Sequence, residues 1–465
     1  MKSDEFEHWA CKAAEFTVAY RDGLNDMPVR SRTQPGDIYK ALPKAPPDTG
    51  SPMEEIFADF ERIVPPGMTH WQHPRFFAYF PSNAAPASVI AEYLVTGMAA
   101  QCMLWQTSPA ATEMETRMLE WLRDGIGLPS DFAGVIQDSA SSATLAAILV
   151  MRERALGWAG NTTGLSGGPC LRVYASSEVH SSIDRAIWFS GIGTDNLVRI
   201  PTSGAIRGMD PDLLDQAIRA DLNAGHKPVG IVACTGGTSN GACDDIAAVV
   251  KIAKTHDLYT HVDAAWAGAA MICPENRHLW SGVEGADSVV FNPHKWLGAS
   301  FDCSAHFIRD PQALRRTLAI QPEYLRTLDQ DGVTNYSEWS LPLGRRFRAL
   351  KIWFLIRYHG LDGLRDIIRK HIEWTHMLCA RLRNTEGIEI VTDPILALFS
   401  FRLENDDDKT LKLVEAINND GRIYLTQTKM SGRPAIRFTA GSFAMQASDI
   451  DIAYQAIMDC RKALS

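Results

Sequence analysis

Two neighbouring apolar runs of the sequence carry a charge where a buried strand would be all hydrocarbon. The run YTHVDAA (259–265) contains Asp263, and the run SVVFNPH (288–294) is followed directly by Lys295. A helix cap would explain the carboxylate by itself, and a side chain extending to the surface would explain the lysine. Both charges together, at the ends of two adjacent strands, require partners, because an unpaired buried charge is costly.

A pyridoxal phosphate (PLP) ring would supply both partners. Its aldehyde forms a Schiff base with a lysine amine, and its pyridinium nitrogen pairs with a carboxylate. We therefore predict that Lys295 attaches this cofactor and that Asp263 lies at its ring nitrogen.

The cofactor phosphate also needs hydrogen-bond donors. In GVIQDSASSAT (134–144), three residues fall in the first turn of a helix that follows a strand: Ser139, Ala140 and Ser141. Free N–H groups and the positive end of the helix dipole favour an anion there. The same letters are also an ordinary capping sequence, so the prediction depends on the charged pair downstream. Two residues beside the lysine are further candidates for the phosphate: Asn292 and His294.

A histidine follows another predicted strand. His180 stands in SSEVHSSIDRA after the strand LRVYAS, where its imidazole can stack flat on a heteroaromatic ring or simply be a loop histidine. Other cofactor motifs are disfavoured: there is no GxGxxG or GxxxxGK[ST], and the nearest stretch, GGTSNGAC, lacks the lysine. A metal site at His256, His261 and Asp263 is also disfavoured, because their spacing gives no fixed coordination geometry.

Alternating strands and helices must position these residues. From about 86 to 350 the sequence alternates between β-branched runs and helical runs, which is typical of a mainly parallel sheet covered on both faces. In such a sheet, ligands bind at the carboxyl ends of the strands, where the candidate residues fall. The predicted strands are LRVYAS, LVRIPT, VGIVACT, YTHVDAA and SVVFNPH, and the predicted helices are SSATLAAILVMRERAL, PDLLDQAIRADLNAG and DIAAVVKIAKTHD.

We expect three parts of the chain. Residues 1–85 form an N-terminal helical segment with a Pro-rich connector, and its amphipathic stretch MEEIFADFERIV must pack on another surface. Residues 86–352 form the large α/β domain. Residues 353–465 form a small C-terminal α+β domain that follows a long helical stretch, RALKIWFLIRYHGLDGLRDIIRKHIEW.

Composition excludes several classes of protein. The 465 residues are 46% hydrophobic and 22% charged, which is ordinary for a globular protein. The net charge of -9 gives no basic patch for nucleic acid, and no apolar run is long enough for a membrane span. The nine cysteines form no CxxC pair, so we expect reduced thiols, no zinc ribbon and a cytoplasmic protein.

At these residues the sequence resembles the group II PLP-dependent decarboxylases, most closely the aromatic L-amino-acid decarboxylases. The resemblance runs nearly end to end: PGMTHWQHPRFFAYFPSN, GVIQDSASSAT, HSSIDRA, HVDAAWAGAAMICPENRHLWSGVEGADS, FNPHKWLGASFDCS and PLGRRFRALKIWF. It implies the fold type I (aspartate aminotransferase-like) architecture and a homodimer. The N-terminal segment would wrap the partner subunit, with the active site at the subunit interface.

Carried over position by position, the resemblance implies a role for each site residue. Lys295 would attach PLP, Asp263 would pair with the pyridinium nitrogen, and His180 and Ala265 would sandwich the ring. Thr238 in CTGGTSNG would lie near the ring. The remaining cofactor contacts would be Ser139, Ala140, Ser141, Asn292 and His294.

The resemblance also predicts the product. Tyr336, in the polar stretch LDQDGVTNYSE (328–338), matches the tyrosine of a mobile catalytic loop and would protonate Cα after carbon dioxide leaves. Related aldehyde synthases replace that tyrosine, typically by phenylalanine, so its presence favours an amine. An aromatic aldehyde synthase remains an alternative.

The substrate pocket implied by the resemblance is aromatic. Gly344 leaves room for a bulky ring, and Met103 stands where animal members have phenylalanine, so the preferred aromatic amino acid is left open: tryptophan, tyrosine, phenylalanine or dihydroxyphenylalanine. A decarboxylase of acidic substrates would need a basic residue at the pocket mouth, where PRFFAYFPSN offers only Arg75. A cofactor-binding protein without turnover is the remaining alternative. The other predicted pocket residues are Trp71, Tyr79, Phe80, Pro81 and Ser82.

Overall fold

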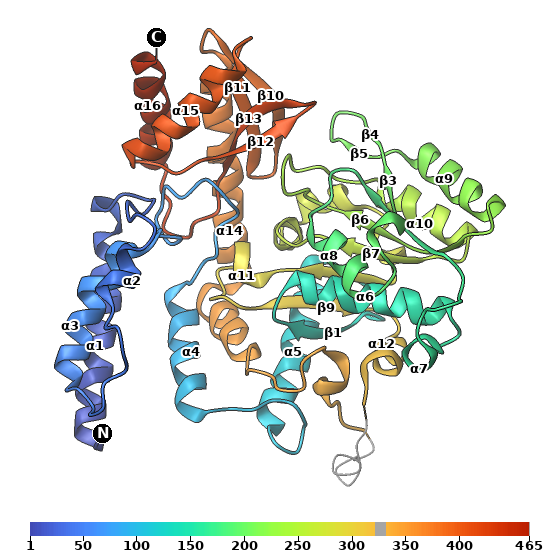
Figure 1. Cartoon of the computed structure of the whole chain (residues 1–465), viewed down its shortest axis with the longest axis horizontal. Coiled ribbons are helices and arrows are strands. Elements are labelled where there is room, and N and C mark those ends of the chain that lie inside the picture. The colour runs from blue at the N-terminus through green and yellow to red at the C-terminus, as the bar shows by residue number, and fades with distance from the viewer. Residues whose placement is uncertain (321–331, 465) are drawn as a thin grey trace. The chain divides into compact units, whose positions relative to one another are not determined.

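The computed structural model describes residues 1–320 and 332–464 (Figure 1). They fall into two compact units. Unit 1 comprises Met1–Pro81, His376–Val391 and Ser400–Ser465, and unit 2 comprises Ser82–Thr375 and Thr392–Phe399.

Unit 2 is built on a seven-stranded sheet with the strand order β1-β9-β8-β7-β6-β2-β3. Six of these strands run parallel, and β9 is antiparallel to both of its neighbours. The central strands are buried at nearly every position, as expected when helices cover both faces of a sheet. The strands are β1 (Ala133–Gln137), β2 (Leu171–Ser176), β3 (Leu197–Ile200), β6 (Lys227–Cys234), β7 (Tyr259–Asp263), β8 (Ser288–Phe291) and β9 (Ser304–Ile308).

Helix α6 (Ala140–Ala155) follows β1 directly and contacts β6, β7, β8 and β9. It approaches the sheet closely at Gly230 of β6, where a Cβ atom would lie 2.5 Å from Sδ of Met151. Side-chain caps fix where other helices begin. The flanking helices are α4 (Pro86–Met98), α5 (Pro109–Ile126), α8 (Ser182–Phe189), α9 (Pro211–Asn223, capped by Asp210), α10 (Ile246–Thr255, capped by Asp245) and α12 (Pro311–Leu318, capped by Asp310).

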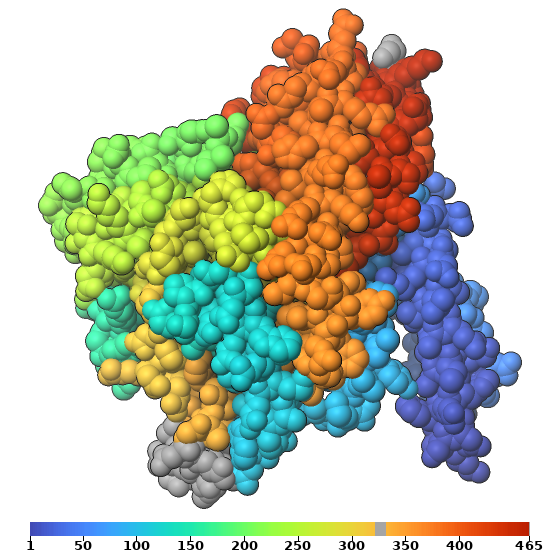
Figure 2. All heavy atoms as spheres, turned by 180° about the vertical axis from the view of Figure 1, so that it is seen from behind, coloured from blue at the N-terminus to red at the C-terminus, as the bar shows by residue number. Residues whose placement is uncertain are grey.

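The long stretch predicted as one helix is interrupted. Helix α14 (Ala349–Arg383) has non-helical backbone at Gly360, whose φ of 65° is readily available to glycine. The part that follows the break lies beside α5: a Cβ at Gly125 would be 3.8 Å from Leu361. Figure 2 shows this face, with α5 in cyan next to α14 in orange.

Unit 1 contains helices α1 (Ser3–Asp22) and α3 (Met53–Ile63). The amphipathic segment predicted to need a partner surface packs on α1 through aromatic contacts, with the Phe16 and Phe60 rings 4.9 Å apart. Unit 1 also contains the short helix α2 (Asp37–Ala41). The C-terminal part of the chain forms the sheet β10-β11-β13-β12 and two helices, and the residues of β10 and β11 within 392–399 group with unit 2. Their bounds are β10 (Ile388–Ile395), β11 (Leu398–Leu403), α15 (Asp407–Asp420), β12 (Thr426–Met430), β13 (Arg433–Thr439) and α16 (Ser448–Ala463).

The fold class is confirmed: a mostly parallel sheet between helices, with a small C-terminal sheet. The division into units differs from the predicted parts 1–85, 86–352 and 353–465, because residues 1–81 group with the C-terminal segments. Phe77 N–H donates to the Tyr424 carbonyl at 3.0 Å, and Arg75 forms a buried ion pair with Asp449 at 3.2 Å. Among the described residues, no helix combines the length and apolar character that a bilayer span needs.

Candidate active site

A cavity of about 100 Å³ lies at the carboxyl ends of parallel strands in unit 2. Ligands of parallel sheets bind at these carboxyl ends. Nine of the ten predicted cofactor contacts line the cavity. They are Ser139, Ala140, Ser141, His180, Thr238, Asp263, Ala265, Asn292 and Lys295. The lining also includes Ser182, Cys234, Gly236 and Trp266.

Asp263 is the last residue of β7, with neighbours β6 and β8 hydrogen-bonded on either side. Its Oδ1 accepts a hydrogen bond from the Ala265 N–H at 3.0 Å, which fixes the carboxylate against the strand end. Only 7% of its surface is exposed. A carboxylate held this way at a cavity wall is suited to pair with a cationic ligand atom.

Lys295 lies in α11 (Pro293–Trp296), the short helical turn that follows β8. Its backbone is held at both ends: its N–H donates to the Asn292 carbonyl at 3.0 Å, and its carbonyl accepts from Nδ2 of Asn83 at 2.8 Å. Because β8 is hydrogen-bonded to β7, the lysine and Asp263 stand at adjacent strand ends, as the sequence predicted.

His180 follows β2 and lines the cavity. Its Nδ1 accepts from the Ser182 N–H at 3.0 Å and lies 2.8 Å from the Ser182 hydroxyl. A ring nitrogen that accepts from a backbone N–H carries no proton, so the ring is the neutral tautomer with hydrogen on Nε2. Desolvation by the surrounding protein lowers the pKa of His180, which also favours the neutral ring.

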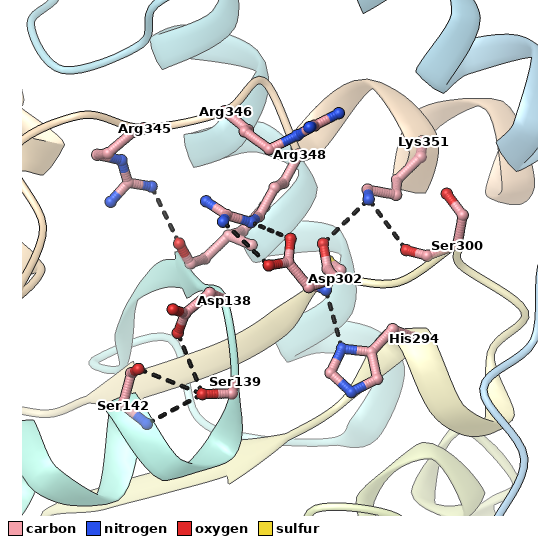
Figure 3. Close-up of polar contacts among 12 residues, drawn as sticks. Asp138, Ser139, Ser142, His294, Ser300, Asp302, Arg345, Arg346, Arg348 and Lys351 are labelled. Carbon is pink, nitrogen blue, oxygen red and sulfur yellow. Dashed lines mark hydrogen bonds and ion pairs between the residues drawn. The ribbon is translucent and has the colours of Figure 1, made fainter. Parts of the chain in front are cut away.

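The start of α6 forms the anion-binding turn. Ser139 is the N-cap residue, and its Oγ accepts from the Ser142 N–H at 3.2 Å while lying 3.1 Å from Oδ1 of Asp138 (Figure 3). This cap leaves the other first-turn N–H groups of a 16-residue helix at the cavity, together with the positive end of its dipole. The turn is therefore suited to hold a phosphate.

Four lining residues were not predicted from the sequence: Ser182, Cys234, Gly236 and Trp266. Gly236 has a φ of +86°, and a Cβ there would lie 2.5 Å from the Cβ of Ala267, so no larger residue fits this turn. Cys234 ends β6, where the buried carboxylate of Asp244 accepts from its N–H at 2.7 Å. Burial raises the pKa of Asp244 to about 6. Their common signal was position, because each lies at the end of a strand or within two residues after a strand end or a predicted site residue.

His294 is the one predicted cofactor contact that does not line the cavity. Its Nδ1 accepts from the Cys303 N–H at 2.8 Å, and its ring lies 4.8 Å from that of Phe301. Burial lowers its pKa to about 3, so the imidazole is neutral and holds the loop that follows Lys295. Contact with the phosphate stays a prediction.

Tyr336 also lies away from the cavity lining. It begins the short helix η7 (Tyr336–Trp339), is 3% exposed, and its hydroxyl is 2.8 Å from that of Thr116. The Arg345 guanidinium covers its ring at 5.1 Å, and burial raises the pKa of the phenol. The structure therefore does not bring the predicted proton donor to the cofactor residues. Of the predicted loop 328–338, residues 328–331 lie outside the described residues.

The predicted substrate contacts are not among the residues that line the cavity. In unit 1, Trp71 stacks on Tyr79 at 5.9 Å, and both rings are partly exposed. In unit 2, the Met103 carbonyl accepts from the Ser337 N–H at 3.1 Å, and a Cβ at Gly344 would lie 3.1 Å from Nε2 of Gln101. The pocket formed by these two with Trp71, Tyr79, Phe80, Pro81 and Ser82 stays a prediction.

The residues at the cavity fit PLP. An amine, a fixed carboxylate, a flat neutral imidazole and a helix N-terminus match the aldehyde, the ring nitrogen, the ring face and the phosphate of this cofactor.

Comparison with known proteins gives an independent result. The model of the pyridoxal-dependent decarboxylase conserved domain matches residues 35–404. An aromatic-L-amino-acid decarboxylase from Sus scrofa is 36% identical over 471 residues, covering 98% of this chain and 96% of that protein. A phenylacetaldehyde synthase from Arabidopsis thaliana is 35% identical over 475 residues, covering 99% of this chain and 96% of that protein.

The same relationship appears in three dimensions. The crystal structure of Oryza sativa TDC with PLP and tryptamine superposes with a TM-score of 0.96 at 33% identity, covering 100% of this chain and 99% of that one. Sequence and structure agree over the whole chain, and the cavity carries the groups that PLP requires. This chain belongs to the family of pyridoxal-dependent decarboxylases.

Proposed function

We propose that this enzyme uses PLP to decarboxylate an aromatic L-amino acid, giving the arylalkylamine and carbon dioxide. The observation that carries the proposal is the convergence of Lys295, Asp263 and His180 on one cavity at the carboxyl ends of the sheet. The relatives described above support the substrate class, since one is an aromatic-L-amino-acid decarboxylase and another was solved with tryptamine.

The chemistry follows from the residues. When bound, PLP supplies an aldehyde that links to amines and a protonated ring that accepts the electron pair released at Cα. The Asp263 carboxylate would keep a proton on the ring nitrogen, because a fixed anion stabilises the adjacent cation. Lys295 would be the attachment point, and the neutral face of His180 would keep the ring flat without adding charge.

An aromatic aldehyde synthase is the second candidate. A phenylacetaldehyde synthase is as similar to this chain as the decarboxylases are. The presence of Tyr336 favoured the amine over the aldehyde at the level of sequence. In the structure this tyrosine is buried against Thr116 and does not line the cavity. The amine product therefore rests on the relatives rather than on this tyrosine.

We also propose a homodimer with the active site at the subunit interface. Helix α4 exposes a row of large apolar side chains, which a second copy would cover: Ile90, Tyr93, Leu94 and Met98. Sedimentation over a range of concentrations should give the mass of two chains, whereas the mass of one chain throughout would refute the dimer. A cytoplasmic location is the accompanying proposal, supported by nine free cysteines.

Product analysis tests the proposed function. Purified protein with PLP and air is offered aromatic, acidic and imidazole amino acids, and the products are read by mass spectrometry. We expect an aromatic amine without matching aldehyde, and the rate for each ring identifies the preferred substrate. Aldehyde with peroxide would establish the second candidate, and amine only from acidic substrates would contradict the proposed substrate class.

A further inference from the structure

Strand β1 lies at the edge of the unit 2 sheet and leads directly into the anion-binding turn. The free side of an edge strand needs hydrogen-bond partners when it is buried. At Ile136 two side chains provide them: Oε1 of Glu115 accepts from the Ile136 N–H at 2.8 Å, and Nη2 of Arg345 donates to the Ile136 carbonyl at 3.0 Å. Together they do what a neighbouring strand would do.

Glu115, on α5, and Arg345 are also paired with each other. Their side chains are only 4% and 1% exposed, respectively. A pair so completely desolvated is stable only when further hydrogen bonds support it. The Ile136 backbone supplies one to each partner, and Nε of Arg345 keeps no hydrogen-bond partner among the described residues.

The same guanidinium also holds the segment 336–340. Nη1 of Arg345 donates to the Tyr336 carbonyl at 3.1 Å and to the Ser340 hydroxyl at 2.7 Å. A second link starts one residue further along β1, where Nε2 of Gln137 donates to the Trp339 carbonyl at 3.0 Å. The end of β1 is therefore fixed on its open side by α5, by Arg345 and by this segment.

We propose that Glu115 and Arg345 are a positioning pair for the phosphate of PLP. Only Gln137 and Asp138 separate the clamped residue from the Ser139 cap, and Figure 3 shows Arg345 near the turn that carries Asp138 and Ser139. A shift of Ile136 would displace the first-turn N–H groups that face the cavity. Neither side chain lines the cavity, so their effect is exerted through the backbone of β1. This inference rests on the cofactor site of the proposed function.

The test measures PLP affinity rather than turnover. Apo-protein is titrated with PLP and followed by the visible absorbance of the bound cofactor, for Glu115→Gln, Arg345→Lys and the double variant Glu115→Gln/Arg345→Met. The double variant removes both charges, so no lone buried charge prevents folding. Two controls are matched to the variants: Arg117→Lys, whose exposed ion pair with Glu120 lies on the same helix, and Ile218→Val, which lowers stability through the buried face of α9.

We expect each of the three variants to weaken PLP binding by roughly tenfold to a hundredfold, the range seen when supporting groups around a bound ligand are lost. Both controls should bind PLP as the wild type does. Folded variants that bind PLP within about twofold of wild type would overturn the proposal. Loss of folding in all three would also overturn it, since the pair would then serve the stability of the whole unit. Because no substrate is present, an absence of amine product bears only on the proposed function.

Discussion

Two lysines of unit 2 show how differently the fold treats the same side chain. Lys351 in α14 is 1% exposed, and its ammonium group donates to the carbonyls of Ser300 and Asp302, each at 3.0 Å (Figure 3). Its third oxygen partner is the carboxylate of Glu92 at 2.6 Å. Lys295 instead lines a cavity beside Asp263 and His180. An ammonium group saturated by protein oxygens has a structural role, whereas an amine at a cavity wall is placed for chemistry.

The same contrast separates other polar groups of the unit. Asp263, His180 and the start of α6 face the cavity. The Tyr336 hydroxyl and the Arg345 guanidinium, which belong to motifs that resemble the family equally well, are bonded to the protein. Family resemblance alone does not distinguish residues that line the cavity from residues that are bonded within the protein, because the same motifs contain both.

Removing the cavity lysine should have the largest effect. Lys295→Ala deletes the proposed attachment point, so we expect amine formation to fall to background and the visible absorbance of bound PLP to disappear. Circular dichroism should show an unchanged fold. Normal amine production by this variant would refute the role of Lys295.

Removing the saturated lysine should affect stability instead. Lys351→Met leaves two backbone carbonyls without their partner and Glu92 with only its ion pair to Arg346, so we expect a loss of about 3 kcal/mol in the free energy of unfolding. At temperatures where the variant is folded, the absorbance of bound PLP should persist. The comparison fails if this variant keeps wild-type stability but loses the cofactor.

A buried histidine predicts a smaller, pH-dependent effect. His306 is fully buried in β9, neither of its ring nitrogens has a hydrogen-bond partner among the described residues, and burial lowers its pKa to about 3. Below its ordinary value of about 6.5, the unfolded chain binds a proton that the folded chain does not. The free energy of unfolding therefore decreases as the pH is lowered from about 6.5 toward 3. The decrease is up to about 1.4 kcal/mol per pH unit for each such histidine.

His306→Leu should reduce that dependence. The midpoint of urea unfolding is compared between about pH 6.5 and pH 5 for the wild type and the variant. We expect a shallower decline in the variant, because one titrating group is gone. His278→Leu, at an exposed position, is the control, and equal slopes for His306→Leu and the wild type would contradict the assignment.

Tyr336→Phe should have the smallest effect. It removes one hydrogen bond to Thr116, so we expect a loss of about 1 kcal/mol in stability and an unchanged ratio of amine to aldehyde. The matched control is Tyr358→Phe, at an exposed tyrosine of unit 2. A shift from amine toward aldehyde and peroxide in Tyr336→Phe would restore its predicted role as proton donor.

Much of the fold could be predicted because the central strands are short, apolar and separated by amphipathic helices. Strands β2, β6, β7 and β8 lie where the β-branched runs predicted them. The strands not identified interrupt that pattern: β9 (SAHFI) buries Ser304 and His306, and β12 (TQTKM) has exposed polar residues. The break in α14 at Gly360 was also missed, because the residues on both sides of it keep helical spacing.

The location of the cavity could be predicted because the two strands that lead to its charged residues follow each other in the sequence and lie side by side in the sheet. Asp263 ends β7 and Lys295 follows β8, so the proximity of the two residues followed from the pattern. His294 was placed near the cofactor by its position beside Lys295, and Tyr336 by the family resemblance alone. The orientation of these two side chains depends on their tertiary partners, Cys303 for His294 and Thr116 for Tyr336. No local pattern of the sequence encodes those contacts.

The most direct test of the central claim is to locate the cofactor on the chain. Reducing the PLP-bound protein with borohydride fixes the cofactor on its lysine, and tryptic peptides are then mapped by mass spectrometry. We predict the added pyridoxyl group on Lys295, within a peptide of residues 278–309 that trypsin no longer cuts at that lysine. Modification at Lys351 or another lysine instead, or the absence of any adduct, would contradict the account.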